Sequence, residues 1–121
     1  IVSHSSLIAE GTADMARQMI GDAVPIAWCG GNPDGGLGSD IGAIASAIET
    51  AWSDRGVVVF VDLGSTEMNS EMAIEALPPK QGDKVMIMDA PLVEGVIIAT
   101  TTAASGASVE EISLAVQDLA H

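Results

Sequence analysis

The chain has 121 residues, the length of one domain, and we predict a single domain over residues 1–121. Four Lys and Arg residues stand against 17 Asp and Glu residues, which gives a formal charge of −13 at pH 7. This charge argues against a nucleic-acid partner and against binding to an anionic membrane, because both need clustered Lys and Arg.

The remaining composition favours a soluble cytoplasmic protein. No apolar run approaches the roughly 20 residues of a membrane span, and no basic segment of a signal peptide opens the sequence. Cys29 is the lone cysteine, and no group of Cys and His residues has the spacing of a zinc site. We therefore expect neither a metal ion nor a cofactor.

Apolar β-branched runs alternate with amphipathic stretches along the chain, a pattern typical of βαβ units. In chain order we expect strand 1–3, helix 7–20, strand 24–29, helix 40–52, strand 57–62, helix 67–77, strand 85–88, helix 92–104 and a last helix from Ser108. Right-handed crossovers then predict an α/β fold, a small doubly wound α/β/α sandwich with a mainly parallel four-stranded sheet.

Two of the expected helices depend on signals at their ends. Ser108 and Glu111 have the spacing of a capping box, which predicts a helix start. The β-branched residues of segment 92–104 also suit a strand. Pro91 before this segment and Gly106 after it favour a helix instead.

Two side chains at strand ends are the main candidates for chemistry. His4 follows the first strand and Asp62 ends the third, and ligands bind beyond such ends in doubly wound sheets. If the two strands are neighbours, the Asp62 carboxylate can accept the Nδ1 proton of His4 and leave the Nε2 lone pair free to attack phosphorus. The alternative interpretations are a surface-loop histidine and a plain helix N-cap. His121, the other histidine, is the terminal residue.

Two glycine-containing loops border this candidate site. Gly64 and Ser65 follow Asp62 directly, and backbone amides at such a helix start can bind a phosphoryl group; an ordinary turn is the alternative. Loop 30–38 has five glycines but neither a Gly-Lys-Ser/Thr phosphate loop nor the spacing of a dinucleotide fingerprint. We expect this loop to be a flexible rim.

Two other kinds of site are less consistent with the pattern. A hydrolase triad would join Asp62 and His4 to a serine at position 3, 5 or 6, but adjacent residues of an extended segment point apart. The sequence also has no G-x-S-x-G nucleophile elbow. A phosphoaspartate receiver would need an acidic pair at the first strand end, where Ser3 and His4 stand instead.

Several segments, taken in order, resemble one known family. Residues 1–5, Ile-Val-Ser-His-Ser, and 7–11, Leu-Ile-Ala-Glu-Gly, are similar to the opening of mannose-type enzyme IIA domains of the phosphoenolpyruvate phosphotransferase system. Within that family, residues 62–69, Asp-Leu-Gly-Ser-Thr-Glu-Met-Asn, resemble the phosphotransfer subunits of dihydroxyacetone kinases more than the sugar-transport members. Segments 34–39 and 89–95 agree with this, and the resemblance extends to about residue 119.

The resemblance implies a phosphohistidine relay. It implies that His4 is phosphorylated on Nε2, that Asp62 orients the His4 ring, and that the protein is a homodimer. It further implies that the carrier protein HPr donates the phosphoryl group and that ADP on the nucleotide subunit of the kinase accepts it. The alternative acceptor is enzyme IIB of a mannose-type sugar transporter. A third hypothesis is a non-catalytic binding module in which His4 and Asp62 are structural.

Overall fold

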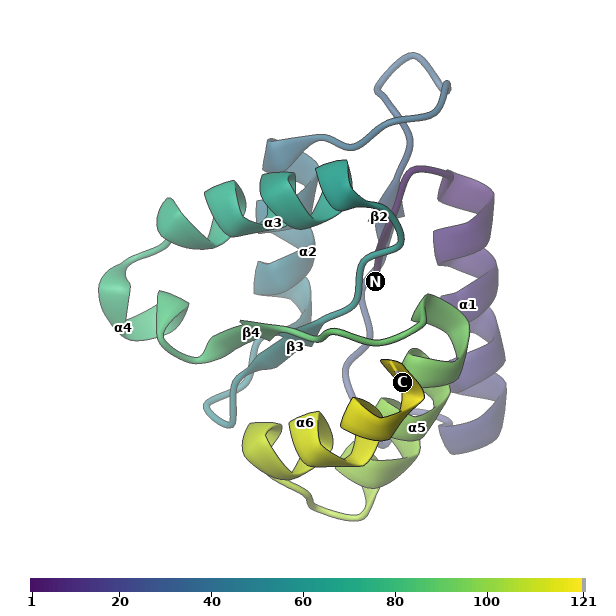
Figure 1. The fold of residues 1–121 in the computed structure, drawn as a ribbon, viewed down its shortest axis with the longest axis vertical. Helices are drawn as coiled ribbons and strands as arrows, with labels where there is room; N and C mark the ends of the chain where they lie inside the picture. Colours follow the sequence, from purple (N-terminus) through teal and green to yellow (C-terminus); the bar gives the residue numbers. More distant parts are fainter. Residues whose placement is uncertain (121) are drawn as a thin grey trace.

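A computed structural model describes residues 1–120, and His121 lies outside the described residues. Strands and helices alternate along most of the chain (Figure 1). The elements are β1 (Val2–Ser3), α1 (Ser6–Ile20), β2 (Cys29–Gly30), α2 (Ile41–Ala51), β3 (Val57–Val59), α3 (Gly64–Glu75), α4 (Pro79–Gly82), β4 (Val85–Ile87), α5 (Leu92–Ala104), α6 (Val109–Gln117) and a 3-10 turn (Asp118–Ala120). None of the helices within residues 1–120 is long and apolar enough to cross a membrane.

The strands are all parallel and lie in the order β2-β1-β3-β4. Regular pairing joins β1 to β2 and β3 to β4, and a single bridge between Val2 and Val61 joins the two pairs. The Val2 amide also donates to the Phe60 carbonyl at 2.8 Å. The predicted four-stranded, mainly parallel sheet is therefore not exact: its strands form two parallel pairs joined by one bridge. β1 has only two residues, and it meets the third strand beyond the last regularly paired residue, Val59.

The second strand is shorter than segment 24–29 because its first part does not pair regularly. Pro25 has no amide hydrogen to donate to a neighbouring strand. The Ile26 carbonyl accepts instead from the guanidinium of Arg17 at 2.5 Å. Regular pairing starts only at Cys29, opposite Val2.

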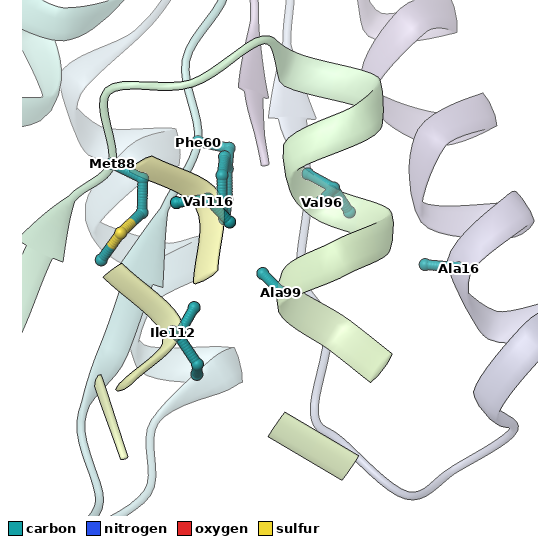
Figure 2. Packing of buried hydrophobic residues seen from close by; sticks show 7 residues of the cluster. All are labelled: Ala16, Phe60, Met88, Val96, Ala99, Ile112 and Val116. Carbon is teal, nitrogen blue, oxygen red and sulfur yellow. The ribbon is translucent and has the colours of Figure 1, made fainter. Parts of the chain in front are cut away.

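The apolar core consists of two clusters, one on each face of the sheet. The cluster on the side of α1, α5 and α6 contains Ala16, Phe60, Met88, Val96, Ala99, Ile112 and Val116. Figure 2 shows α5 lying between Ala16 of α1 and the group formed by Phe60, Met88, Ile112 and Val116. The cluster on the side of α2 and α3 contains Val2, Ile44, Ile48, Val57, Val59 and Ala73. Helices thus cover both faces, and the predicted α/β/α sandwich is confirmed.

Both predictions that depended on helix ends are confirmed. The Ser108 hydroxyl accepts from the Glu111 amide at 3.1 Å, and the Glu111 carboxylate accepts from the Ser108 amide at 3.0 Å, which closes the capping box. Segment 92–104 is helical throughout. Its threonines donate to carbonyls one turn earlier, as Thr100 does to Val96 at 2.9 Å, so their hydroxyls do not compete with the helix.

The helix after the third strand starts three residues earlier than predicted. Gly64, Ser65 and Thr66 have weak helix propensity, which favours a later start. In the structure the Thr66 hydroxyl donates to the Leu63 carbonyl at 2.5 Å, and the Thr66 amide donates to it at 3.0 Å. These local hydrogen bonds let α3 begin at Gly64, next to the candidate site.

Candidate active site

The parallel arrangement of β1 beside the third strand brings His4 and Asp62 together, as the sequence predicts. His4 Nδ1 lies 3.1 Å from Asp62 Oδ1, and the His4 amide donates to Asp62 Oδ2 at 3.0 Å. The side chains are 21% and 19% exposed, so the pair is partly buried but reachable from solvent. The bridge between Val2 and Val61 fixes this pairing, because it sets the two strand ends at the same level.

Two hydroxyl groups also hold the Asp62 carboxylate: that of Ser3, considered from the sequence only as a hydrolase serine, and that of Thr66, which the sequence analysis did not name. Ser3 Oγ donates to Asp62 Oδ2 at 2.7 Å. The single hydrogen of the Thr66 hydroxyl is shared between the Leu63 carbonyl, at 2.5 Å, and Asp62 Oδ1, at 3.1 Å. The Leu63 amide adds a bond to Oδ1 at 2.7 Å. Ser3 and Thr66 are fully buried. In the sequence, the signal for these two partners of Asp62 was a hydroxyl residue directly before His4 and another hydroxyl residue one helical turn after Asp62.

Four of these hydrogen bonds shift the pKa of Asp62. Partial burial of Asp62 acts to raise its pKa, but the bonds from the Ser3 hydroxyl and the His4 amide oppose it. The His4 ring and the Leu63 amide lower the pKa further, and the net result lies well below the usual range of an aspartate. Asp62 is therefore an ionised carboxylate at neutral pH, and it only accepts hydrogen bonds.

An ionised Asp62 fixes the tautomer of the neutral His4 ring. Because the carboxylate can only accept, Nδ1 carries the hydrogen and Nε2 keeps its lone pair. The Ser65 hydroxyl donates to this Nε2 atom in the structure. An imidazole in this tautomer can act as a nucleophile through Nε2, and the Ser65 hydroxyl lies next to that atom.

The start of α3 lies directly beside this ring. Leu63 is the N-cap residue, so Asp62 is not the plain helix N-cap considered from the sequence. Gly64 and Ser65 are the first two residues of the helix, where amides have no carbonyl of the same helix to bind. Of the two residues predicted to bind phosphate, Ser65 contacts His4 Nε2 directly, and Gly64 precedes it in the chain.

The loop after β2 supports His4 from the other side. The Gly38 amide donates to the His4 carbonyl at 2.9 Å. The loop is also bonded within itself, from the Gly31 amide to the Gly38 carbonyl and from the Asn32 amide to the Gly36 carbonyl. Gly38 has φ +146°, in the region that favours glycine. The predicted rim loop is thus attached to the His4 backbone, and we call residues 30–38 the tethered loop.

The loop after β4 makes no hydrogen bond to the two central site residues. Asp89 is exposed, and no hydrogen bond within residues 1–120 links it to His4 or Asp62. The site is formed by the ends of β1 and of the strand that contains β3, together with the tethered loop. Within the same residues, no three His, Cys, Asp or Glu side chains gather closely enough to hold a metal ion.

Ser65, His4 and Asp62 touch in the order of a hydrolase triad, a combination that the sequence did not reveal. A triad also needs an oxyanion hole, often built with the amide after the nucleophile. Here that amide belongs to Thr66, and it already donates to the Leu63 carbonyl at 3.0 Å. The arrangement suits transfer through Nε2 better than acyl transfer through Ser65.

Comparison with known proteins shows the family of this chain. Residues 1–113 match the EIIA-man family, described as the PTS system fructose IIA component. A relative from Escherichia coli (strain K12), named PEP-dependent dihydroxyacetone kinase, phosphoryl donor subunit DhaM, is 41% identical over 93% of this chain and 24% of its own length. The chain thus spans about a quarter of the length of that relative.

A shorter relative and a solved structure extend the likeness. The relative, from Listeria innocua, is named PEP-dependent dihydroxyacetone kinase 2, phosphoryl donor subunit DhaM; it is 39% identical over 93% of this chain and 90% of its own length. A crystal structure of a protein of unknown function superimposes with a TM-score of 0.86 at 38% identity, covering 98% of this chain and 90% of that one. The chain therefore belongs to the mannose-type enzyme IIA family of the phosphotransferase system.

Proposed function

We propose that this protein is the phosphohistidine relay of a phosphoenolpyruvate-dependent dihydroxyacetone kinase, a phosphotransferase. It accepts a phosphoryl group from HPr on His4 and passes it to ADP bound on the nucleotide subunit of the kinase. The names of the relatives support this choice, since they are phosphoryl donor subunits of such kinases. The observation that carries the chemistry is the contact of His4 Nδ1 with Asp62, which leaves Nε2 as the nucleophile.

The transfer needs few chemical groups from this chain. The Nε2 lone pair of His4 attacks the phosphorus, the bond from phosphorus to the donor nitrogen breaks, and the donor imidazole leaves with that electron pair. His4 becomes positively charged as the new bond forms, and the ionised Asp62 stabilises this charge through Nδ1. The Ser65 hydroxyl turns away from Nε2 and, with the amides of Gly64 and Ser65, donates to the phosphoryl oxygens.

A second candidate function is supply of phosphate to a mannose-type sugar transporter through its enzyme IIB. The description of the matched family as a fructose IIA component favours it. The same site chemistry serves both functions, because only the acceptor differs. We also propose that the protein works in the cytoplasm as a homodimer, as family resemblance suggests.

The test is intact-mass analysis after incubation with phosphoenolpyruvate, enzyme I and HPr. The wild-type protein is expected to gain one acid-labile phosphoryl group, and His4→Gln is expected to gain none. Ser65→Ala is the matched control. It removes the contact with Nε2 but should still be phosphorylated on His4. If the site were instead a hydrolase triad, this change would abolish hydrolysis, because Ser65 would be the nucleophile. No gain on wild type, while HPr itself is phosphorylated, would overturn the relay and favour the binding module.

The acceptor is identified in a second step. The phosphorylated protein is mixed with the ADP-loaded nucleotide subunit of a dihydroxyacetone kinase, and separately with a mannose-type enzyme IIB. Loss of the phosphoryl group to ADP supports the kinase relay. Loss only to enzyme IIB would replace it with the transporter function.

A further inference from the structure

Ser3 is a polar side chain at a fully buried position of the central strand β1. This strand lies between β2 and the third strand, where an apolar residue such as its neighbour Val2 is the usual occupant. A hydroxyl group in such a place lowers stability unless it is hydrogen-bonded. The serine is therefore explained by what its hydroxyl binds.

The Ser3 hydroxyl forms two hydrogen bonds, and the direction of each is fixed. The Ser5 amide can only donate, and it lies 3.1 Å from Ser3 Oγ, so the hydroxyl accepts from it. The single hydrogen of the hydroxyl then goes to Asp62 Oδ2 at 2.7 Å, because the ionised carboxylate can only accept. One buried oxygen atom thus connects the backbone just after His4 with the carboxylate that faces the His4 ring.

The two oxygen atoms of Asp62 have different partners. Oδ1 lies 3.1 Å from His4 Nδ1 and accepts from the Leu63 amide at 2.7 Å. Oδ2 accepts from the Ser3 hydroxyl at 2.7 Å and from the His4 amide at 3.0 Å. Rotation of the carboxylate would break these bonds, so the donors to Oδ2 keep Oδ1 opposite the ring. Of these two donors, Ser3 is the one that a side-chain substitution can remove.

We propose that Ser3 is a positioning residue for phosphoryl transfer. Its hydroxyl holds Asp62 Oδ2 and the Ser5 amide, so that Asp62 Oδ1 stays aligned with His4 Nδ1 while Nε2 gains and loses the phosphoryl group. This inference rests on the proposed relay function. Ser3 is buried and acts through Asp62, so its role is to orient the carboxylate rather than to contact the reacting atoms.

The alignment matters because the charge of the His4 ring changes at each transfer. The ring is neutral before the bond from Nε2 to phosphorus forms, and afterwards it carries positive charge that the carboxylate stabilises through Nδ1. A hydrogen bond weakens steeply when its angle is distorted, so a carboxylate free to rotate would stabilise this charge less. It would also allow the neutral tautomer with its hydrogen on Nε2, which has no lone pair there for the attack.

The experiment compares Ser3→Ala and Ser3→Thr with Ser70→Ala. Ser70 serves as the control because it is also fully buried, yet within residues 1–120 its hydroxyl has no partner. Single-turnover phosphorylation of each protein is measured at increasing concentrations of phosphorylated HPr.

The expected loss lies in the chemical step and not in binding of the donor. For Ser3→Ala the maximum rate should fall roughly tenfold or more, because Asp62 is no longer held in line with the ring. The half-saturating concentration of HPr should stay within about twofold of wild type. Ser3→Thr keeps the hydroxyl and Ser70→Ala leaves the site intact, so both maximum rates should stay within about threefold of wild type.

The tautomer of the His4 ring provides a readout that a loss of stability alone would not change. Nitrogen-15 NMR distinguishes a ring nitrogen that carries hydrogen from one that does not, and comparison with His4→Gln assigns the signals of His4. We expect one neutral tautomer, with hydrogen on Nδ1, in wild type and in Ser70→Ala. In Ser3→Ala we expect a mixture of both tautomers.

Mixed tautomers in Ser3→Ala, together with a slower maximum rate at unchanged half-saturation, would support the proposal. A Ser3→Ala protein with the wild-type tautomer and rate, or a loss that Ser70→Ala shares, would overturn it. If Ser3→Thr does not fold, Ser3→Cys replaces it, and its weaker thiol donor should give a rate between those of wild type and Ser3→Ala. Failure of HPr to phosphorylate even the wild type would overturn the relay itself, while the ring tautomer would still decide whether Ser3 orients Asp62.

Discussion

The site and the cluster of apolar residues beside α5 are held by opposite kinds of interaction. At the site, Asp62 accepts five hydrogen bonds, and two of the donors are buried hydroxyl groups. In the cluster, Phe60 packs against α5 so closely that a Cβ on Gly95 would lie 2.7 Å from its ring. The hydrogen bonds of the site are directional and fix the positions of its groups. The apolar packing of the cluster is non-directional and gives most of the stability.

This difference determines what each region tolerates. One hydrogen bond makes a net contribution of about 1 kcal/mol to the free energy of unfolding, whereas a large buried side chain contributes several times as much. Changes in the cluster should therefore lower stability without altering the chemistry of His4. Changes at Asp62 should alter the chemistry strongly and lower stability less. The three predictions below test this division.

The largest effect on stability is expected for Phe60→Ala. The change removes the sole Phe of the chain from the centre of the cluster and leaves a cavity beside Gly95, so the free energy of unfolding should fall by about 3–5 kcal/mol. Urea denaturation measures the loss, and Leu114→Ala, a change at an exposed side chain of α6, should alter the free energy of unfolding by less than about 0.5 kcal/mol. The fraction that stays folded should still accept phosphate from HPr. A folded variant that cannot be phosphorylated would contradict the claim that the cluster affects stability without altering the chemistry of His4.

An intermediate effect is expected for Asp62→Asn. The variant loses charged hydrogen bonds, so its free energy of unfolding should fall by about 2 kcal/mol at pH 7. The rate of His4 phosphorylation should drop roughly a hundredfold or more, because an amide no longer dictates the ring tautomer.

The difference in unfolding free energy between wild type and Asp62→Asn should also shrink as the pH falls. The pKa of Asp62 is lower in the folded state than in the unfolded state. The contribution of the carboxylate is therefore fully present above about pH 5 and is lost as pH falls through the folded value. Wild type and Asp62→Asn should converge in urea titrations at acid pH. A difference that stays constant down to about pH 2 would contradict this account.

The smallest effect is expected for Ser70→Ala. Within residues 1–120 the buried Ser70 hydroxyl finds no hydrogen-bond partner, although it lies one turn after Thr66. Removing it relieves an unsatisfied polar group, so stability should stay equal or rise by up to about 1 kcal/mol. Thr66→Val is the variant to compare with Ser70→Ala, since it removes a buried hydroxyl that does bind Asp62. If both variants lose the same stability, the bond to Asp62 contributes nothing specific.

Much of this protein was predictable from local patterns. Alternating apolar and amphipathic segments predicted the layers, and Ser108 with Glu111 predicted the start of α6, because such signals act over a few residues. His4 and Asp62 were predictable as partners because parallel strand ends meet at one edge of a sheet. The family resemblance, confirmed by the match over residues 1–113, pointed to phosphoryl transfer as the chemistry of the site.

The sequence by itself determined the order of the strands and of the longer helices, and the two principal site residues, since these depend on periodicity and on residue type. The short helix α4 was not predicted. Only the tertiary structure decided that the sheet is two strand pairs joined by one bridge, and that Ser3 and Thr66 hold Asp62. It also decided that α3 begins early enough for Ser65 to reach Nε2. The bridge, the bond from Ser3 to Asp62 and the contact of Ser65 with Nε2 each join residues about 60 positions apart, which no local pattern encodes.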